Sequence, residues 1–285
     1  MMPQGGLGSQ SRERLSAVLR DTQGTISPSQ AARALKLSKP RAAQLLAFWA
    51  SRGWLSRVQR GLYVPIRLES KTSEGPLEDP WVVATALYSP CYIGGWSAAE
   101  HWGLTEQIFR SILVITTKKP RSRKRVLKGT SFILRSIGSK AMFGLKPIWR
   151  GRVRVQVSDP ARTVIDMLSD PSLAGGIRPA ADMLTNLLKE HPKDVDRLIE
   201  YAKRLGNGAA LKRLGFLLET LRLDQASLVA ACRKQLTSGY VKLDPALPSQ
   251  LLITAWRLWV PKAWKPERGN DLPRRDAGGR SRVSA

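Results

Sequence analysis

The spacing of hydrophobic residues in the first 68 positions predicts helices followed by a β-hairpin. The segment Ser11–Arg20 carries apolar residues at helical spacing. A second helix is expected after Ser27, because Ser27 and Gln30 have the spacing of a capping box and Pro28 suits the first helical position. The apolar pattern of this short helix ends near Leu37.

A third helix is predicted to begin after Ser38, its N-cap, and to run to about Arg52, where Gly53 ends it. One face of this helix gathers large apolar residues and is expected to be buried. The opposite face carries small or amide-bearing side chains that fit a major groove: Pro40, Ala43, Gln44, Ala47 and Ser51. Helix, short helix, turn and longer helix is the order of a helix-turn-helix, and Phe48 falls on the border of the two faces.

Two short strands are predicted directly after the third helix, at Leu55–Val58 and Leu62–Val64. Between them Gln59, Arg60 and Gly61 form the turn, in which glycine allows a positive φ. A hairpin in this place is the wing of a winged helix-turn-helix. The fold class expected for the chain is therefore α+β, with this winged unit first.

Beyond the wing, the pattern predicts a mixed domain. Three β-like runs, at residues 112–116, 131–136 and 153–157, predict a small sheet, and the period is helical from Pro160 to about Leu236. A last β-like run, Leu251–Val260, is expected to return to the sheet. The predicted organisation is a DNA-binding domain at 1–70, a linker at 71–80, a second domain at 81–260 and a disordered basic tail at 261–285.

Charge indicates the class of partner. The net charge of +25, from 47 Lys and Arg against 22 Asp and Glu, favours a polyanion, and residues 1–68 hold eleven basic residues against Glu13 and Asp21. A membrane is the weakest alternative, since no apolar run reaches the ~18 residues that span a bilayer. The N-terminal sequence has no apolar signal-peptide core, so a cytoplasmic protein with two free buried thiols, Cys91 and Cys232, is expected.

Several polar groups invite a catalytic interpretation, and each has a simpler one. Ser97 and His101 stand four apart, but no acidic residue or oxyanion loop accompanies them, and Ser97 with Glu100 fits a capping box. Asp159, Asp166 and Asp170 lack the carboxylate-plus-lysine pattern of a nuclease, so they are interpreted as capping and solvated residues, with Pro160 as the first residue of a helix. No catalytic residue, metal or cofactor is predicted.

The basic segment 118–128, with seven cations in eleven positions, is either an exposed hairpin loop or an extension of a nucleic-acid surface. Cations at the start of the third helix and on the wing are placed to meet base edges or phosphates. The predicted DNA-binding residues are Ser38, Lys39, Arg41, Gln44, Arg57, Arg60, Arg123, Lys124 and Arg125.

Four strings resemble the AbiEi antitoxins of abortive-infection, type IV toxin–antitoxin systems: RGLYV, YIGGWSAAEHWGLTEQ, SDPARTVIDML followed by Gly175 and Gly176, and YAKRLGNGAALKRLGFLLE. Their order and spacing match over roughly residues 12–260. The resemblance implies an N-terminal winged helix that represses its own operon by binding double-stranded DNA. It also implies a C-terminal domain needed for antitoxin activity and a nucleotidyltransferase-like toxin encoded alongside.

Two other classes of function stay open. One is an enzyme acting on nucleic acid, such as a nuclease, that the winged helix targets. The other is an RNA-binding adaptor without sequence-specific DNA recognition. A clustered carboxylate site would favour the enzyme, and a preference for single strands with stacked bases would favour the adaptor.

Overall fold

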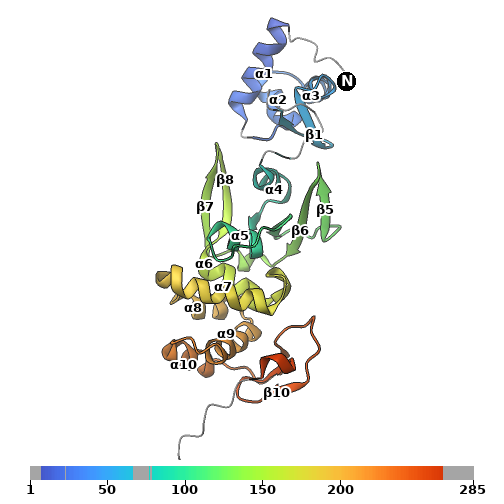
Figure 1. Ribbon diagram of the computed structural model, residues 1–285. Helices are drawn as coiled ribbons and strands as arrows, with labels where there is room; N and C mark the ends of the chain where they lie inside the picture. The colour runs from blue at the N-terminus through green and yellow to red at the C-terminus, as the bar shows by residue number, and fades with distance from the viewer. Residues whose placement is uncertain (1–7, 23, 67–76, 78, 266–285) are drawn as a thin grey trace, which may run out of the picture. The chain divides into compact units, whose positions relative to one another are not determined.

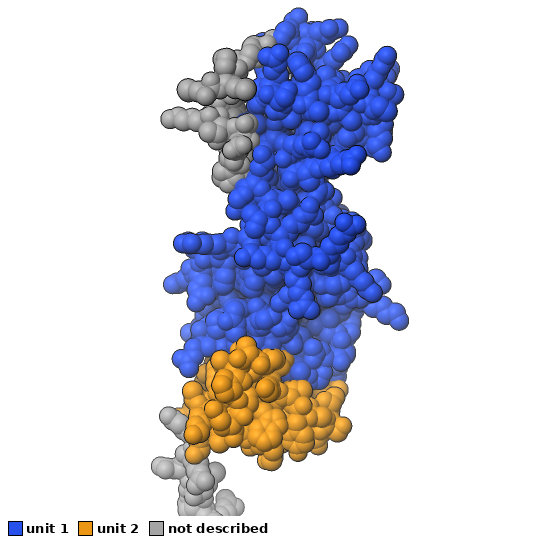
Figure 2. Space-filling model, turned by 90° about the vertical axis from the view of Figure 1, so that its right-hand side faces the viewer, with its two compact units in different colours: residues 1–211 blue, residues 212–285 orange. Residues whose placement is uncertain are grey.

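The computed structural model describes residues 8–22, 24–66, 77 and 79–265. The chain divides into two compact units, residues 1–211 and 212–285, which Figure 2 draws in blue and orange. Most of the predicted linker and residues 266–285 of the predicted tail lie outside the described residues. The first residues of the predicted tail are ordered, since Lys262–Trp264 form a 3-10 helix in which Trp264 is buried. Within the linker segment, Leu77 is buried and Asp79 caps the next helix. The domain boundaries at 70, 80 and 260 stay predictions.

The N-terminal part of the first unit contains the three helices and the hairpin (Figure 1): α1 (Ser9–Asp21), α2 (Pro28–Leu35), α3 (Lys39–Ser51), β1 (Leu55–Gln59) and β2 (Leu62–Pro65). The capping box of α2 is confirmed, since Ser27 Oγ accepts from the Gln30 amide and Gln30 Oε1 accepts from the Ser27 amide. The turn after α2 is made by Lys36, whose φ of 52° is left-handed. These elements fit a winged helix-turn-helix.

One apolar core joins these elements. Val18, Ile26, Ala42, Leu46 and Trp49 are fully buried. A backbone bridge between Ile26 and Tyr63 adds the segment before α2 to the edge of the hairpin. The helical spacing in α3 thus buries the face that the sequence predicts.

A six-stranded sheet follows, in the order β5-β6-β4-β3-β8-β7. Its strands are β3 (Cys91–Ile93), β4 (Ser111–Thr116), β5 (Lys124–Leu127), β6 (Thr130–Ser136), β7 (Leu145–Arg150) and β8 (Val153–Ser158). The three predicted strands correspond to β4, β6 and β8. The pairings β4–β6 and β3–β8 are parallel, whereas β3–β4, β5–β6 and β7–β8 are antiparallel.

Helices cover both faces of this sheet. Alternation along β3 turns Cys91 and Ile93 toward α4 (Pro80–Tyr88), in one core with Val83. Tyr92 turns the other way and meets α6 (Pro160–Ser169). Against α6 pack α5 (Gly95–His101), α7 (Ile177–Glu190) and α8 (Arg197–Leu205) (Figure 1).

Two local predictions in this part of the chain are wrong. Ser97 and Glu100 form no capping box: α5 begins at Gly95, and Ser97 Oγ accepts a hydrogen bond from the Leu113 amide. Glycine is required at Gly95 because its φ is 50° and a Cβ there would overlap the side chain of Leu113.

The second wrong prediction concerns the basic segment 118–128, which is only in part a loop. Residues Lys124–Leu127 form the edge strand β5, and the turn of the hairpin comes later, at Lys128 and Gly129. Only residues 118–123 form the loop that leads into β5.

The helical periodicity predicted to Leu236 is confirmed by α9 (Gly208–Thr220) and α10 (Ala226–Lys234). The predicted return of Leu251–Val260 to the main sheet is wrong. That run forms two strands, β10 (Leu251–Ile253) and β11 (Leu258–Val260), which join β9 (Val241–Lys242) in a separate three-stranded sheet. Pairing with β9 and the local β10–β11 turn satisfy its backbone within the second unit.

A tight contact holds α9 to this small sheet. Gly215 lies against the ring of Trp256, where any Cβ would overlap the indole. The indole nitrogen of Trp256 donates to Glu219 at 2.6 Å, and Arg233 donates to the same carboxylate while its guanidinium lies over the indole ring.

Candidate nucleic-acid interface

The exposed face of α3 is the first part of the candidate interface. Alanine and glutamine at helical spacing leave Gln44 and Ala47 exposed, while Leu46 and Trp49 are fully buried on the other side. Phe48, which the sequence left unplaced, is 48% exposed, and the guanidinium of Arg52 lies 5.4 Å from the centre of its ring. The face that is free for a groove therefore includes an aromatic ring beside the small and amide-bearing residues.

The first turn of α3 presents polar groups to solvent. Ser38 is the N-cap residue as predicted, but its hydroxyl makes no capping hydrogen bond. Ser38, Lys39 and Arg41 are all exposed. Because helix N-termini leave backbone amides without helical partners, an anion is favoured at this end of α3.

The wing presents its cations on the outer side of the hairpin. Arg57 and Arg60 are exposed, whereas Leu55, Val58 and Leu62 are buried. Simple alternation does not account for this pattern, because Leu55 and Arg57 are two residues apart on the same side of β1, and the register with β2 shifts between Arg57 and Gln59. The turn is closed by Gly61, whose φ is 78°, as expected of a glycine in a tight hairpin.

Arg125 of β5 contacts the wing, which the sequence did not predict. Arg123, Lys124 and Arg125 are exposed, and the Arg125 guanidinium donates a 2.9 Å hydrogen bond to the side-chain carbonyl of Gln59. Gln59, which the sequence pattern places only in the turn, is thus a further residue of the candidate interface. Gln59 and Arg125 are 66 positions apart, and local patterns in the sequence do not indicate contacts over that separation.

The carboxylates of α6 are occupied by a buried polar network. Arg162 is fully buried and its Nε donates to Asp166 at 2.9 Å, while Tyr92 donates to the other oxygen of Asp166 at 2.8 Å. Burial raises the pKa of Asp166, and the Arg162 guanidinium opposes that rise. Asp166 is therefore a buried, paired group, and its interpretation as solvated is wrong.

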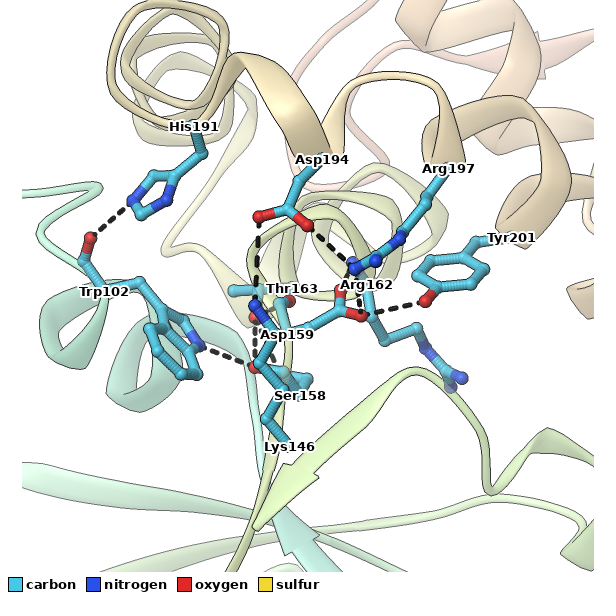
Figure 3. Close-up of polar contacts among 10 residues, drawn as sticks. All are labelled: Trp102, Lys146, Ser158, Asp159, Arg162, Thr163, His191, Asp194, Arg197 and Tyr201. Carbon is cyan, nitrogen blue, oxygen red and sulfur yellow. Dashed lines mark hydrogen bonds and ion pairs between the residues drawn. The ribbon is translucent and has the colours of Figure 1, made fainter. Parts of the chain in front are cut away.

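Asp159 is the centre of a second group of contacts (Figure 3). As predicted, it caps α6, accepting from the Arg162 amide at 2.8 Å, and it also accepts from Tyr201 at 2.8 Å and lies 3.7 Å from Arg197. Burial, followed by the bond to Asp159, raises the pKa of Tyr201 to about 12. These bonds hold α8 against the start of α6.

Ser97 and His101, which the sequence offered as a possible nucleophile pair, make separate contacts in the structure. His101 lies between the rings of Trp81 and Trp102, and Ser97 is bonded to the backbone of Leu113. Among the described residues there is no group of three or more His, Cys, Asp and Glu that could hold a metal ion. Cys91 and Cys232 are free and buried, as expected.

The described helices include none that is both long and apolar enough to cross a membrane.

The helices and hairpin of the N-terminal part fit the winged helix-turn-helix class, and one family model matches the same segment. The sequence model of one family, described as "Transcriptional regulator, AbiEi antitoxin", matches residues 13–66. The match confirms the resemblance to AbiEi antitoxins for the segment from within α1 through β2, which contains the string RGLYV. The other three strings lie outside the matched residues. No curated protein matches the chain.

Proposed function

We propose that this chain is a sequence-specific DNA-binding autorepressor and the antitoxin of a type IV, abortive-infection toxin–antitoxin system. The observation that carries the proposal is the coincidence of two features in residues 13–66. This segment matches the AbiEi regulator family, and its helices and hairpin fit a winged helix-turn-helix whose outer face carries small, amide-bearing and cationic side chains beside the ring of Phe48.

The proposed mechanism of DNA binding divides the cations by role. Gln44 on the exposed face of α3 reads base edges in the major groove, and Lys39 and Arg41 contact bases or phosphates at its N-terminus. Arg57 and Arg60 contact phosphates from the wing. Arg125, bonded to Gln59, extends this positive surface to the edge of the six-stranded sheet, together with Arg123 and Lys124.

The proposed operator is double-stranded DNA upstream of the protein's own operon, with inverted repeats, and the proposed site of action is the cytoplasm. The proposed toxin is a nucleotidyltransferase-like protein encoded alongside. Residues 81–260 are proposed to supply the antitoxin activity, and residues 1–70 the recognition of DNA.

Co-expression with the neighbouring toxin tests these roles together. The full chain should restore growth and repress a reporter under its own promoter, whereas a Gln44→Ala, Arg41→Ala variant should lose repression. The halves, residues 1–70 and 81–285, are expressed separately beside the toxin. Growth rescue by residues 1–70 alone would mean that repression suffices, and the antitoxin role of the second domain would be withdrawn.

The enzyme alternative is tested with purified protein and labelled duplex and single-stranded DNA and RNA in the presence of Mg²⁺ or Mn²⁺. No cleavage is expected, because Asp159 and Asp166 are committed to helix capping and to the pair with Arg162. Cleavage that disappears in Asp159→Asn or Asp166→Asn, with the fold intact, would replace the regulator by a nuclease.

A further inference from the structure

The three-stranded sheet of the second unit has an outward face that its own fold leaves exposed. Along β11, Leu258 and Val260 are fully buried, and Trp259 between them is 40% exposed. The register places Trp259 beside Leu252 of β10 and beside Lys242 of β9. All three are exposed, so they form one row across the sheet.

A second exposed aromatic ring comes next to this row in the sequence. Tyr240 directly precedes β9, two residues before Lys242, and it is 56% exposed. Its neighbour Val241 is partly buried and Leu243 is fully buried, as expected for the inner face. The outward row and the residue directly before β9 thus supply two exposed rings and a lysine.

The surrounding charge is positive. Residues 212–265 contain nine Lys and Arg and three acidic residues. Glu219 is bonded to Trp256 and Arg233, Asp244 is buried and caps the turn at Ala246, and Asp224 lines a groove between α9 and α10. None of the acidic residues described in this segment belongs to the Leu252, Trp259 and Lys242 row.

We propose that this face, the row of Leu252, Trp259 and Lys242 with Tyr240, binds single-stranded nucleic acid by stacking unpaired bases on Trp259 and Tyr240. Lysine is depleted from the centres of protein–protein interfaces, whereas it pairs well with phosphates. The bases of a duplex are stacked on one another and are not open to an aromatic ring, whereas each exposed ring can stack on one unpaired base of a single strand. Exposed aromatic rings, a central lysine and no acid therefore favour a single strand over a protein partner or a duplex.

The test uses the full chain and fluorescence anisotropy of labelled 12-nucleotide single strands, one of RNA and one of DNA. Excess unlabelled operator duplex is present, so the N-terminal unit is saturated. Trp259→Ala and Tyr240→Ala should each weaken single-strand binding by roughly 5- to 100-fold, the usual contribution of one stacked base. Trp259→Phe, which keeps a ring, should stay within about threefold of the unchanged protein.

Trp149 on β7, which is 69% exposed, supplies the matched control, because Trp149→Ala removes an exposed indole outside the second unit. Its single-strand affinity should not change, and operator binding should be unaffected in every variant of the sheet face. Unchanged affinity in both Trp259→Ala and Tyr240→Ala, with thermal melting intact, would overturn the proposal. Equal losses in Trp149→Ala would also overturn it, as would self-association that Trp259→Ala abolishes.

Discussion

Gln59 in the wing turn and Arg125 on the edge strand β5 are joined by a 2.9 Å hydrogen bond between the amide oxygen and the guanidinium. The bond is exposed, so its own contribution to stability is small, about 0.5–1.5 kcal/mol. The bond matters for where Arg125 lies, because it holds this cation of the six-stranded sheet against the wing, which carries Arg57 and Arg60.

Removal of single cations should show which of them contact phosphate. Arg57→Ala, Arg60→Ala and Arg125→Ala should each weaken binding to most duplex sequences alike and lower the salt slope by about one unit. Lys203→Ala, which removes an exposed cation of α8, is the control and should change neither quantity. Salt-titrated binding measures this, and unchanged slopes in all three arginine variants would move the interface elsewhere.

Gln44 should instead determine sequence preference. An amide on the exposed face of α3 can form two hydrogen bonds with the major-groove edge of a single adenine, so Gln44→Ala should cost roughly 1–3 kcal/mol at one base position and little at the others. Binding to a set of single-base operator variants measures the change. A uniform loss over all positions would identify Gln44 as a backbone contact.

Gly215 should tolerate no side chain. A Cβ there overlaps the ring of Trp256, which its bond to Glu219 and the Arg233 guanidinium hold in place. Gly215→Ala should therefore lower the free energy of unfolding by about 1–3 kcal/mol through overpacking. Gly239→Ala is the control, since nothing lies within 4 Å of a Cβ at that position. Urea titration compares the two, and equal stabilities would show that the ring moves aside.

The pair of Arg162 and Asp166 should be the most sensitive polar contact of the first unit. Asp166→Ala leaves a fully buried guanidinium without its carboxylate and should cost about 3–5 kcal/mol. Tyr92→Phe removes the hydrogen bond from the Tyr92 hydroxyl to the same carboxylate and the bond that this hydroxyl accepts from Arg162, but it leaves the ion pair in place and should cost less, about 1–2 kcal/mol. Chemical unfolding measures both, and a smaller loss in Asp166→Ala than in Tyr92→Phe would contradict the assigned order.

Tyr201 should make stability fall at alkaline pH. Its pKa is about 12 in the fold, raised first by burial and then by Asp159, against about 10 in an unfolded chain. The unfolded chain thus loses this proton first, so the stabilisation is complete below pH 10 and is lost as the pH rises toward 12. The free energy of unfolding, measured from pH 8 to 11, should fall less steeply with pH in Tyr201→Phe than in the unchanged protein. An equal fall with pH in the two proteins would assign the loss of stability to other groups.

The sequence by itself determined the elements whose causes are local. The capping box of Ser27, the prolines that open helices, Gly61 in the wing turn and the helical spacing in α3 all act within a few residues of one another. Such features fix the order of helices and hairpin and the buried face of α3.

The tertiary structure decided what depends on contacts between distant positions. The strand β3 is only three residues long and has no pattern of its own, yet it lies between β4 and β8. Asp166 is buried because Tyr92 and Arg162 both donate hydrogen bonds to it. The segment Leu251–Val260 pairs with β9 and not with the six-stranded sheet. The hydrogen bond between Arg125 and Gln59 likewise joins distant positions of the chain. Hydrogen-bond partners far apart in the chain are chosen by the packing of whole elements, which local periodicity does not encode.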